Sequence, residues 1–168
     1  WFKKIKFFDS LKSNYKYSYS KKLLKKIKKN KNFRLIGIGG SILGAEAIYK
    51  FLNHKIKKKF IFFSNLNSKI IDYDKKIKAT NIIISKSGNT LETIVNSNAL
   101  ISRGKNIFIT ENKDNYLRRL ANNLRSEIIE HKNYIGGRYS VLSEAGMIPA
   151  ELMGLSATKF KQFNYLIK

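Results

Sequence analysis

The feature that most constrains this chain is a short apolar run that leads into glycines and a serine and then into a helical pattern, at residues 34–47 (RLIGIGGSILGAEA). Backbone N–H groups that no side chain covers, next to the positive end of a helix, can bind a phosphate or another anion. Junctions of the same kind follow at residues 82–93 (IIISKSGNTLET) and 136–143 (GGRYSVLS). Three such junctions in one chain predict a binding site.

Short apolar runs alternate with helical patterns along the chain. The expected strands are residues 33–38, 60–63, 81–84, 106–110 and 127–130, and the expected helices are residues 17–30, 43–52, 68–77, 116–124 and one that begins near Thr90. Strands that alternate with helices at this spacing indicate βαβ units. We therefore expect an α/β fold, a three-layer αβα sandwich around a five-stranded parallel sheet. Ligands of such sheets bind at the carboxyl ends of the strands, where all three junctions lie.

Helical spacing predicts which side chains face the core. The expected inward residues are Leu23, Leu24 and Ile27 in the first helix, Leu43, Ala47, Ile48, Phe51 and Leu52 in the second, Leu91, Ile94 and Val95 after Thr90, and Leu117, Leu120, Ala121 and Leu124 near the end.

Four residues are expected to set helix boundaries. Ser41 is a candidate N-cap, and Asn89 with Glu92 has the spacing of a capping box. Pro149 is expected to interrupt or restart the last helical pattern.

Composition adds a strong positive charge. The chain of 168 residues has the length of one domain, and its 34 basic and 11 acidic residues give a net charge of +23. Such a charge by itself indicates nucleic acid or an anionic surface as the partner. Lysine, isoleucine and asparagine dominate, however, a composition typical of AT-rich coding sequence. We therefore expect lysines scattered over the surface and no nucleic-acid partner; a basic nucleic-acid-binding domain, with salt-dependent binding, is the weaker alternative.

The chain has no cysteine, so neither a disulfide framework nor a thiolate metal site is available. No apolar run has the length of a membrane span, and the first residues (WFKKIKFF) do not resemble a signal peptide. We expect a cytoplasmic protein without a membrane partner. Because it opens at Trp1, the chain is also expected to be part of a longer protein.

The glycine junctions do not fit nucleotide cofactors. Ile42 stands where a dinucleotide fingerprint needs its third glycine, and the second strand ends in Ser64 and Asn65 rather than an acidic residue. Residues 45–46, after Gly44, are Ala-Glu instead of the Lys and Ser or Thr of a P-loop. Both patterns argue against NAD and nucleoside triphosphates.

What remains is a set of hydroxyls and backbone amides suited to a phosphate monoester. The hydroxyls are those of Ser41, Ser85, Ser87 and Thr90, with Thr93 as a further candidate. Any one of them can instead be a helix cap, but their density favours a ligand. Lys86 and Arg138 are the cations expected near the crevice.

Together, the blocks GIGGSILGAEA, SKSGNTLET and GGRYSVLSEAG resemble the phosphoglucose isomerase family. The first is similar to the first loop of its sugar-phosphate isomerase (SIS) domain, the second to its phosphate loop, and the third to its GGRxS signature. The resemblance covers about residues 34–154. It implies a flavodoxin-like SIS domain at residues 33–155, after a leading helical segment at residues 1–32. Residues 156–168 would begin the connection to a second SIS domain.

The resemblance also implies an activity and roles. The family interconverts glucose 6-phosphate and fructose 6-phosphate, in glycolysis and gluconeogenesis, as a homodimer without metal or organic cofactor. Its phosphate ligands correspond to Ser41, Ser85, Lys86, Ser87 and Thr90, and its loop backbone to Gly39, Gly40, Gly88 and Gly137. The signature arginine, which stabilises the enediolate, corresponds to Arg138.

The resemblance exposes an absence too. The family's catalytic glutamate, its ring-opening histidine and a further lysine lie in the second SIS domain, beyond this chain. Glu92, Glu144 and Glu151 are poor substitutes, and His54 and His131 are expected to be surface histidines. We therefore expect the chain alone to be inactive. A stand-alone sugar-phosphate-binding SIS module and another phosphosugar isomerase remain as alternatives.

Overall fold

The computed structural model describes residues 6–66, 77–101 and 105–166. Within them, parallel strands form one five-stranded sheet in the order β2-β1-β3-β4-β5. The strands are β1 (Asn32–Ile36), β2 (Lys59–Phe63), β3 (Thr80–Ile84), β4 (Asn106–Thr110) and β5 (Glu127–Glu130). The expected α/β sandwich with a flavodoxin-like strand order is confirmed.

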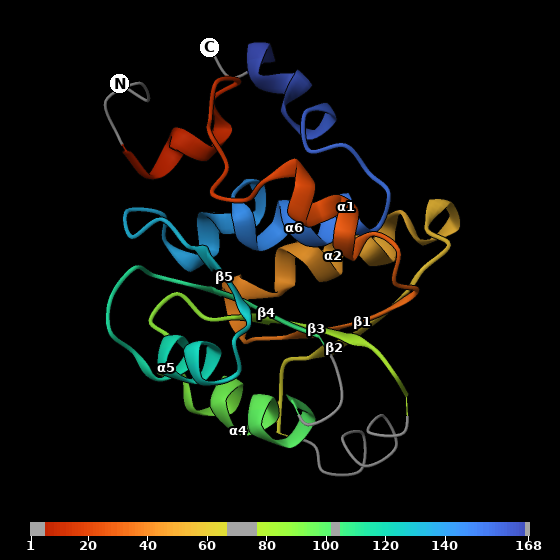
Figure 1. The fold of residues 1–168 in the computed structure, drawn as a ribbon. Coiled ribbons are helices and arrows are strands. Elements are labelled where there is room, and N and C mark those ends of the chain that lie inside the picture. Colours follow the sequence, from red (N-terminus) through yellow and green to blue (C-terminus); the bar gives the residue numbers. More distant parts are fainter. Residues whose placement is uncertain (1–5, 67–76, 102–104, 167–168) are drawn as a thin grey trace.

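Helices cover both faces of the sheet (Figure 1). On one face lie α1 (Lys21–Ile27), α2 (Leu43–Phe51) and α6 (Glu144–Leu152), and on the other α4 (Leu91–Leu100) and α5 (Tyr116–Asn123). Short 3-10 helices are η2 (Lys6–Leu11), η3 (Gly39–Ser41), η4 (Asn53–Lys55), η6 (Gly137–Leu142) and η7 (Lys159–Leu166). The helix expected at residues 68–77 lies outside the described residues except for Ile77. No helix in the described ranges has both the length and the apolar character needed to cross a membrane.

Alternation along the strands builds two core layers. Leu35, Ile82 and Ile109 pack under α1, α2 and α6, whereas Ile83 and Phe108 pack against α4 and α5. Both faces of the central strands are buried, which is why their sequences are mainly apolar. The exceptions Arg34 and Asn81 are buried as well, and the Arg34 guanidinium donates to the Asn81 Oδ1 at 3.3 Å. The parallel register places the carboxyl ends of the strands together at one edge of the sheet.

Two of the predicted helix starts are wrong. The N-cap of α2 is Ile42, because residues 39–41 form a 3-10 turn in which the Ser41 N–H donates to the Ile38 carbonyl at 3.3 Å. The N-cap of α4 is Thr90, without a side-chain cap bond. Asn89 does not cap α4, because its Oδ1 accepts a hydrogen bond from the Tyr116 N–H at 2.9 Å.

The predicted inward faces hold for α1 and α5 and only in part for α2 and α4, on which Ile48 and Ile94 pack against the core as expected. Leu24, Ile27, Leu117 and Ala121 are buried as expected, with Leu124 exposed at the end of α5. On α2 the inward residues are Ala45 and the half-buried Ile48 and Tyr49, while Leu43 and Phe51 are 58% and 81% exposed. On α4, Leu91 and Val95 are exposed, whereas Thr93, Asn96, Ser97 and Leu100 are buried. On each of these two helices a second set of residues also has helical spacing, and it is this set that faces the core.

Pro149 does not interrupt α6, which runs unbroken from Glu144 to Leu152. A proline inside a helix costs about 3 kcal/mol. Every residue of α6 except Glu151 is buried, and this burial outweighs the local cost. The Pro149 carbonyl still serves as an acceptor, for the Met153 N–H at the C-cap of α6, at 2.9 Å.

Candidate functional site

The first and third glycine junctions pack backbone against backbone. A Cβ atom at Gly40 would lie 2.3 Å from the Gly137 carbonyl carbon and 2.6 Å from the Arg138 nitrogen. Such distances leave no room for a side chain, so glycine is required at position 40. Two loops about a hundred residues apart in sequence are thereby held in contact, as expected for junctions that share an edge of the sheet.

Ser140 of the GGRYS sequence stabilises the contact between the first and third loops. Its buried hydroxyl lies 3.1 Å from the Gly40 carbonyl and 2.7 Å from the Gly137 carbonyl. A serine hydroxyl has a single proton, so the two carbonyl oxygens share it as a three-centre donor. The serine of the signature therefore holds the two loops together rather than facing a ligand.

The second junction gathers three hydroxyls in front of α4. The Ser85 Oγ lies 2.9 Å from the Thr90 Oγ1, and the Ser87 Oγ lies 3.5 Å from the same atom. The Gly88 N–H donates to the Ser85 Oγ at 3.2 Å, and Gly88 has a φ of +68°, which favours glycine. Hydroxyls and amides before a ten-residue helix form the donor set that a phosphate monoester needs.

Two contacts fix this loop in place. A Cβ atom at Gly88 would lie 2.0 Å from the Asn115 Oδ1, which itself caps α5 by accepting from the Arg118 N–H. The loop also approaches the first junction, because a Cβ atom at Gly37 would lie 2.8 Å from the Ile84 carbonyl oxygen and 3.5 Å from the Ser41 Cβ. Among the described residues, no hydrogen bond joins Ser41 to the Ser85, Ser87 and Thr90 hydroxyls.

Thr93, by contrast, does not belong to this group. Its side chain is buried on α4, and its Oγ1 has no hydrogen-bond partner among the described residues.

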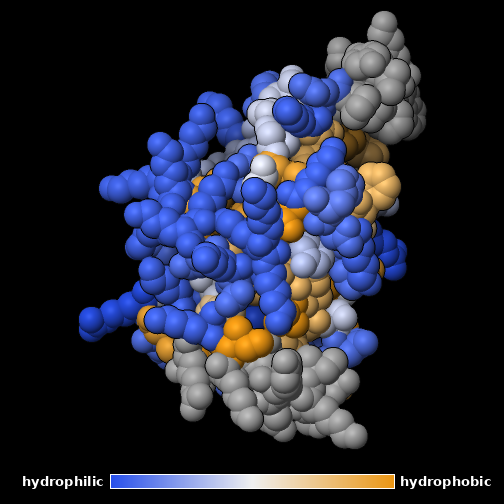
Figure 2. All heavy atoms as spheres, turned by 90° about the vertical axis from the view of Figure 1, so that its right-hand side faces the viewer, coloured by the Kyte–Doolittle hydropathy of each residue, from blue (hydrophilic) through white to orange (hydrophobic). Residues whose placement is uncertain are grey.

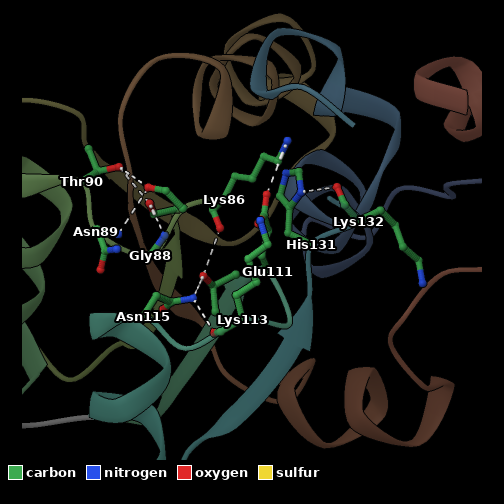
Figure 3. Close-up of polar contacts among 12 residues, drawn as sticks. Lys86, Gly88, Asn89, Thr90, Glu111, Lys113, Asn115, His131 and Lys132 are labelled. Atoms are coloured by element: carbon green, nitrogen blue, oxygen red, sulfur yellow. Dashed lines mark hydrogen bonds and ion pairs between the residues drawn. The ribbon is translucent and has the colours of Figure 1, made fainter. Parts of the chain in front are cut away.

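The two cations of the predicted site have different surroundings. The Lys86 amine forms an ion pair with Glu111 at 3.5 Å, and Lys113 binds the same carboxylate at 3.2 Å. In Figure 3 the Lys86 side chain extends toward Glu111 and His131, away from Thr90. Arg138 is exposed in η6 and makes no ion pair with the described residues. The role of each in binding a ligand stays a prediction.

His131 is not a surface histidine, as the sequence led us to expect, but fully buried. It follows β5, and its N–H donates to the Thr110 carbonyl, which extends the β4–β5 ladder. Its Nδ1 lies 3.2 Å from the Lys132 carbonyl, and its Nε2 is buried without a partner in the described part of the chain. Burial lowers the pKa of His131 below its ordinary value of 6.5, so the ring is neutral at neutral pH. His54 is exposed as expected.

Both carboxylates of α6 already have partners. Glu144 is fully buried and accepts hydrogen bonds from the Tyr15 hydroxyl at 2.8 Å and the Ser18 N–H at 2.9 Å. Glu151 binds Lys28 at 3.1 Å and the Ala157 N–H at 3.0 Å. Both carboxylates therefore attach neighbouring segments of the chain to α6.

Sequence reasoning missed Glu111 and His131. Both follow strands directly, and position after a strand is the signal that could have found them. Among the described residues, no group of His, Asp and Glu side chains is placed to hold a metal ion.

A doubly wound sheet with glycine loops and clustered hydroxyls at its carboxyl edge defines a class of phosphate-binding α/β domains. Comparison with known proteins narrows the class. The family model of phosphoglucose isomerase matches residues 6–166. This chain belongs to the phosphoglucose isomerase family.

Relatives in sequence agree with that family, and solved structures share the fold of this chain. The chain is 33% identical over 139 residues to the glucose-6-phosphate isomerase of Methanocaldococcus jannaschii, an alignment that covers 76% of this chain and 34% of that protein. It thus spans about a third of the length of that relative. A hypothetical protein from Thermus thermophilus has a TM-score of 0.70 at 23% identity, covering 86% of this chain and 40% of that one. Tagatose-6-phosphate ketose/aldose isomerase from Escherichia coli has a TM-score of 0.65 at 15% identity, and the match covers 96% of this chain and 46% of that one.

Proposed function

We propose that this chain supplies the phosphate-binding half of an active site that interconverts glucose 6-phosphate and fructose 6-phosphate. The observation that carries the proposal is the cluster of Ser85, Ser87 and Thr90 hydroxyls before α4, next to loops held in contact at Gly40 and Gly137. Ser41 and the amides of Gly39 and Gly137 complete the phosphate site, while Gly88, whose N–H donates to the Ser85 Oγ, shapes the second loop. Family membership supports the choice of substrate.

Arg138 is assigned the catalytic role. Aldose–ketose isomerisation moves a proton between C1 and C2 and builds negative charge on the enediolate oxygens. A guanidinium, which stays charged at any working pH, stabilises that charge best where water is excluded. Exposure of Arg138 in this chain is consistent with a site that other sequence closes.

The catalytic base is assigned to sequence outside the described residues. A base must be free to take the substrate proton, whereas Glu144 and Glu111 are held by hydrogen bonds or ion pairs. Glu92 lies in the first turn of α4, where an acidic side chain is accounted for by the stabilisation it gives to the helix start. We infer that the isolated chain binds sugar phosphates without converting them, and that the complete enzyme is a homodimer.

The experiment measures binding and turnover with the chain as it stands. Calorimetry compares glucose 6-phosphate with a sugar acid phosphate whose carboxylate mimics the enediolate, and a coupled assay follows isomerisation. We expect no turnover, tighter binding of the acid, and loss of that preference by about 100-fold in Arg138→Ala, the effect typical of an oxyanion-stabilising group.

Arg119→Ala is the matched control, because Arg119 is an exposed arginine on α5. Robust isomerase activity from the chain alone would refute the assignment of the base. Equal affinity for both ligands, unchanged in Arg138→Ala, would favour a sugar-phosphate sensor instead.

A further inference from the structure

The amino ends of the strands, opposite the candidate site, carry a concentration of cations. A basic residue stands at or just before the start of every strand of the described sheet, namely Lys31, Lys59, Lys78, Lys105 and Arg125. All are exposed. Because the strands are parallel, their starts lie along one edge, and we name these residues with Lys29 the basic edge. Figure 2 faces this end of the molecule and shows it as mainly hydrophilic.

The basic edge is hollowed. A hollow of ≈ 440 Å³ lies there, lined by Lys29, Lys31, Lys78 and Lys105 with asparagine and threonine side chains between them. None of these lining residues belongs to the candidate sugar-phosphate site. Two of the lining side chains are joined by a hydrogen bond, in which the Asn30 Nδ2 donates to the Thr80 Oγ1 at 2.6 Å. A second hollow of ≈ 300 Å³ shares Lys105 and continues to Arg125.

The charges along this edge are largely uncompensated. None of Lys29, Lys31, Lys78 and Lys105 has a carboxylate partner among the described residues. The acidic side chain that lines the second hollow, Glu127, lies 3.8 Å from Lys26. Like charges held together destabilise the folded chain, and a polyanion would relieve that repulsion.

We propose that the basic edge binds the phosphate backbone of a nucleic-acid duplex. Neighbouring strands lie about 4.8 Å apart, so five strand starts spread their cations over about 19 Å, which suits a row of phosphates better than a single small anion. Within the described ranges, neither hollow is lined by an aromatic side chain. These hollows therefore provide no surface on which bases could stack. The contacts are to the phosphate backbone of the duplex and are independent of its base sequence.

This inference departs from the expectation that the lysines are scattered and that no nucleic acid binds. Codon bias accounts for many lysines but predicts no preferred edge. A site at the basic edge predicts that binding depends on which lysines are removed. Binding through the general positive charge predicts that it depends only on how many are removed. The inference does not rest on the proposed isomerase function, because the two sites lie at opposite edges of the sheet.

The test is fluorescence anisotropy with labelled RNA and DNA duplexes of about 20 base pairs, at about 50 mM and about 200 mM KCl. Four phosphate contacts give a slope of about −3.6 in log K against log salt, or about 150-fold weaker binding at the higher salt. In the quadruple variant Lys29→Gln, Lys31→Gln, Lys78→Gln and Lys105→Gln the slope should fall by about 0.9 per lysine. Circular dichroism checks that each variant is folded.

The matched control removes four exposed lysines elsewhere, with Lys6→Gln, Lys16→Gln, Lys113→Gln and Lys159→Gln. It should keep the wild-type slope, as should Ser85→Ala, and RNA and DNA should bind within about threefold of each other because only phosphates are contacted. Equal losses in both quadruple variants would overturn the proposal. So would no duplex binding at low salt, or binding that polyglutamate or phosphatidylserine vesicles displace as well as unlabelled duplex does.

Discussion

Gly40 and Gly137 face each other across the contact between the first and third loops, but only one of them is sterically required to be glycine. A Cβ atom at Gly40 would overlap backbone atoms of Gly137, whereas a Cβ atom at Gly137 would lie 3.9 Å from the Gly40 Cα, an ordinary contact. Each glycine was expected in the site from the sequence. The asymmetry between them was not, because it depends on how two distant loops meet.

Alanine substitution should expose this asymmetry. Gly40→Ala should lower the free energy of unfolding by about 3 kcal/mol, the upper end of the usual cost of overpacking. Gly137→Ala should change it by less than about 0.5 kcal/mol. Urea denaturation of both variants checks the prediction, and equal effects would mean that the two loops do not meet as described.

His131 should make the folded chain sensitive to acid. Its pKa is lowered by burial, beside Glu111, Glu144 and Lys86, so below pH 6.5 the unfolded chain takes up a proton that the folded chain does not. Stability is therefore lost as pH falls below 6.5, by up to about 1.4 kcal/mol per pH unit.

His131→Phe should remove this part of the pH dependence, measured by urea denaturation between about pH 7.5 and about pH 5. His54→Gln, at an exposed histidine, serves as the control and should keep the wild-type dependence. An unchanged slope in His131→Phe would show that this ring titrates alike in the folded and unfolded chains.

At the scale of elements, the strands could be predicted and the helix faces only in part. A strand buried on both sides is a continuous apolar run, and β3 and β4 match their expected bounds within a residue. α4 misleads because its apolar residues Leu91 and Val95 are exposed, while Thr93 and Ser97 are buried. The Ser97 hydroxyl donates to the Thr93 carbonyl at 2.6 Å, which satisfies it inside the helix. Hydrophobicity alone could not reveal that.

Paired substitutions on α4 test which face is buried. Leu91→Gln should change stability by less than about 0.5 kcal/mol, because Leu91 is 67% exposed. Leu100→Ala should cost about 2–5 kcal/mol, because Leu100 is 2% exposed and packs in the core. Thermal and urea unfolding of the two variants provides the comparison. The opposite ranking would restore the face that the sequence pattern predicts.

At the scale of the whole molecule, parallel topology separates two kinds of surface. The carboxyl edge holds the glycine loops and hydroxyls, and the amino edge holds the cations of the basic edge. The clustering of the Ser85, Ser87 and Thr90 hydroxyls could be predicted because these residues lie close together in sequence. Glu111 and His131 could not, since their approach to Lys86 depends on strand order; nor could the basic edge, whose members are far apart in sequence.

The central claim is that three separate junctions form one sugar-phosphate site. A ¹H–¹⁵N NMR titration of the chain with glucose 6-phosphate tests it most directly. We predict that the amides of Gly40, Gly88 and Gly137 shift together with a single Kd, that glucose without phosphate shifts none of them, and that the amides of Lys31 and Lys78 stay unmoved. Shifts confined to one junction, or centred on the basic edge, would contradict the account.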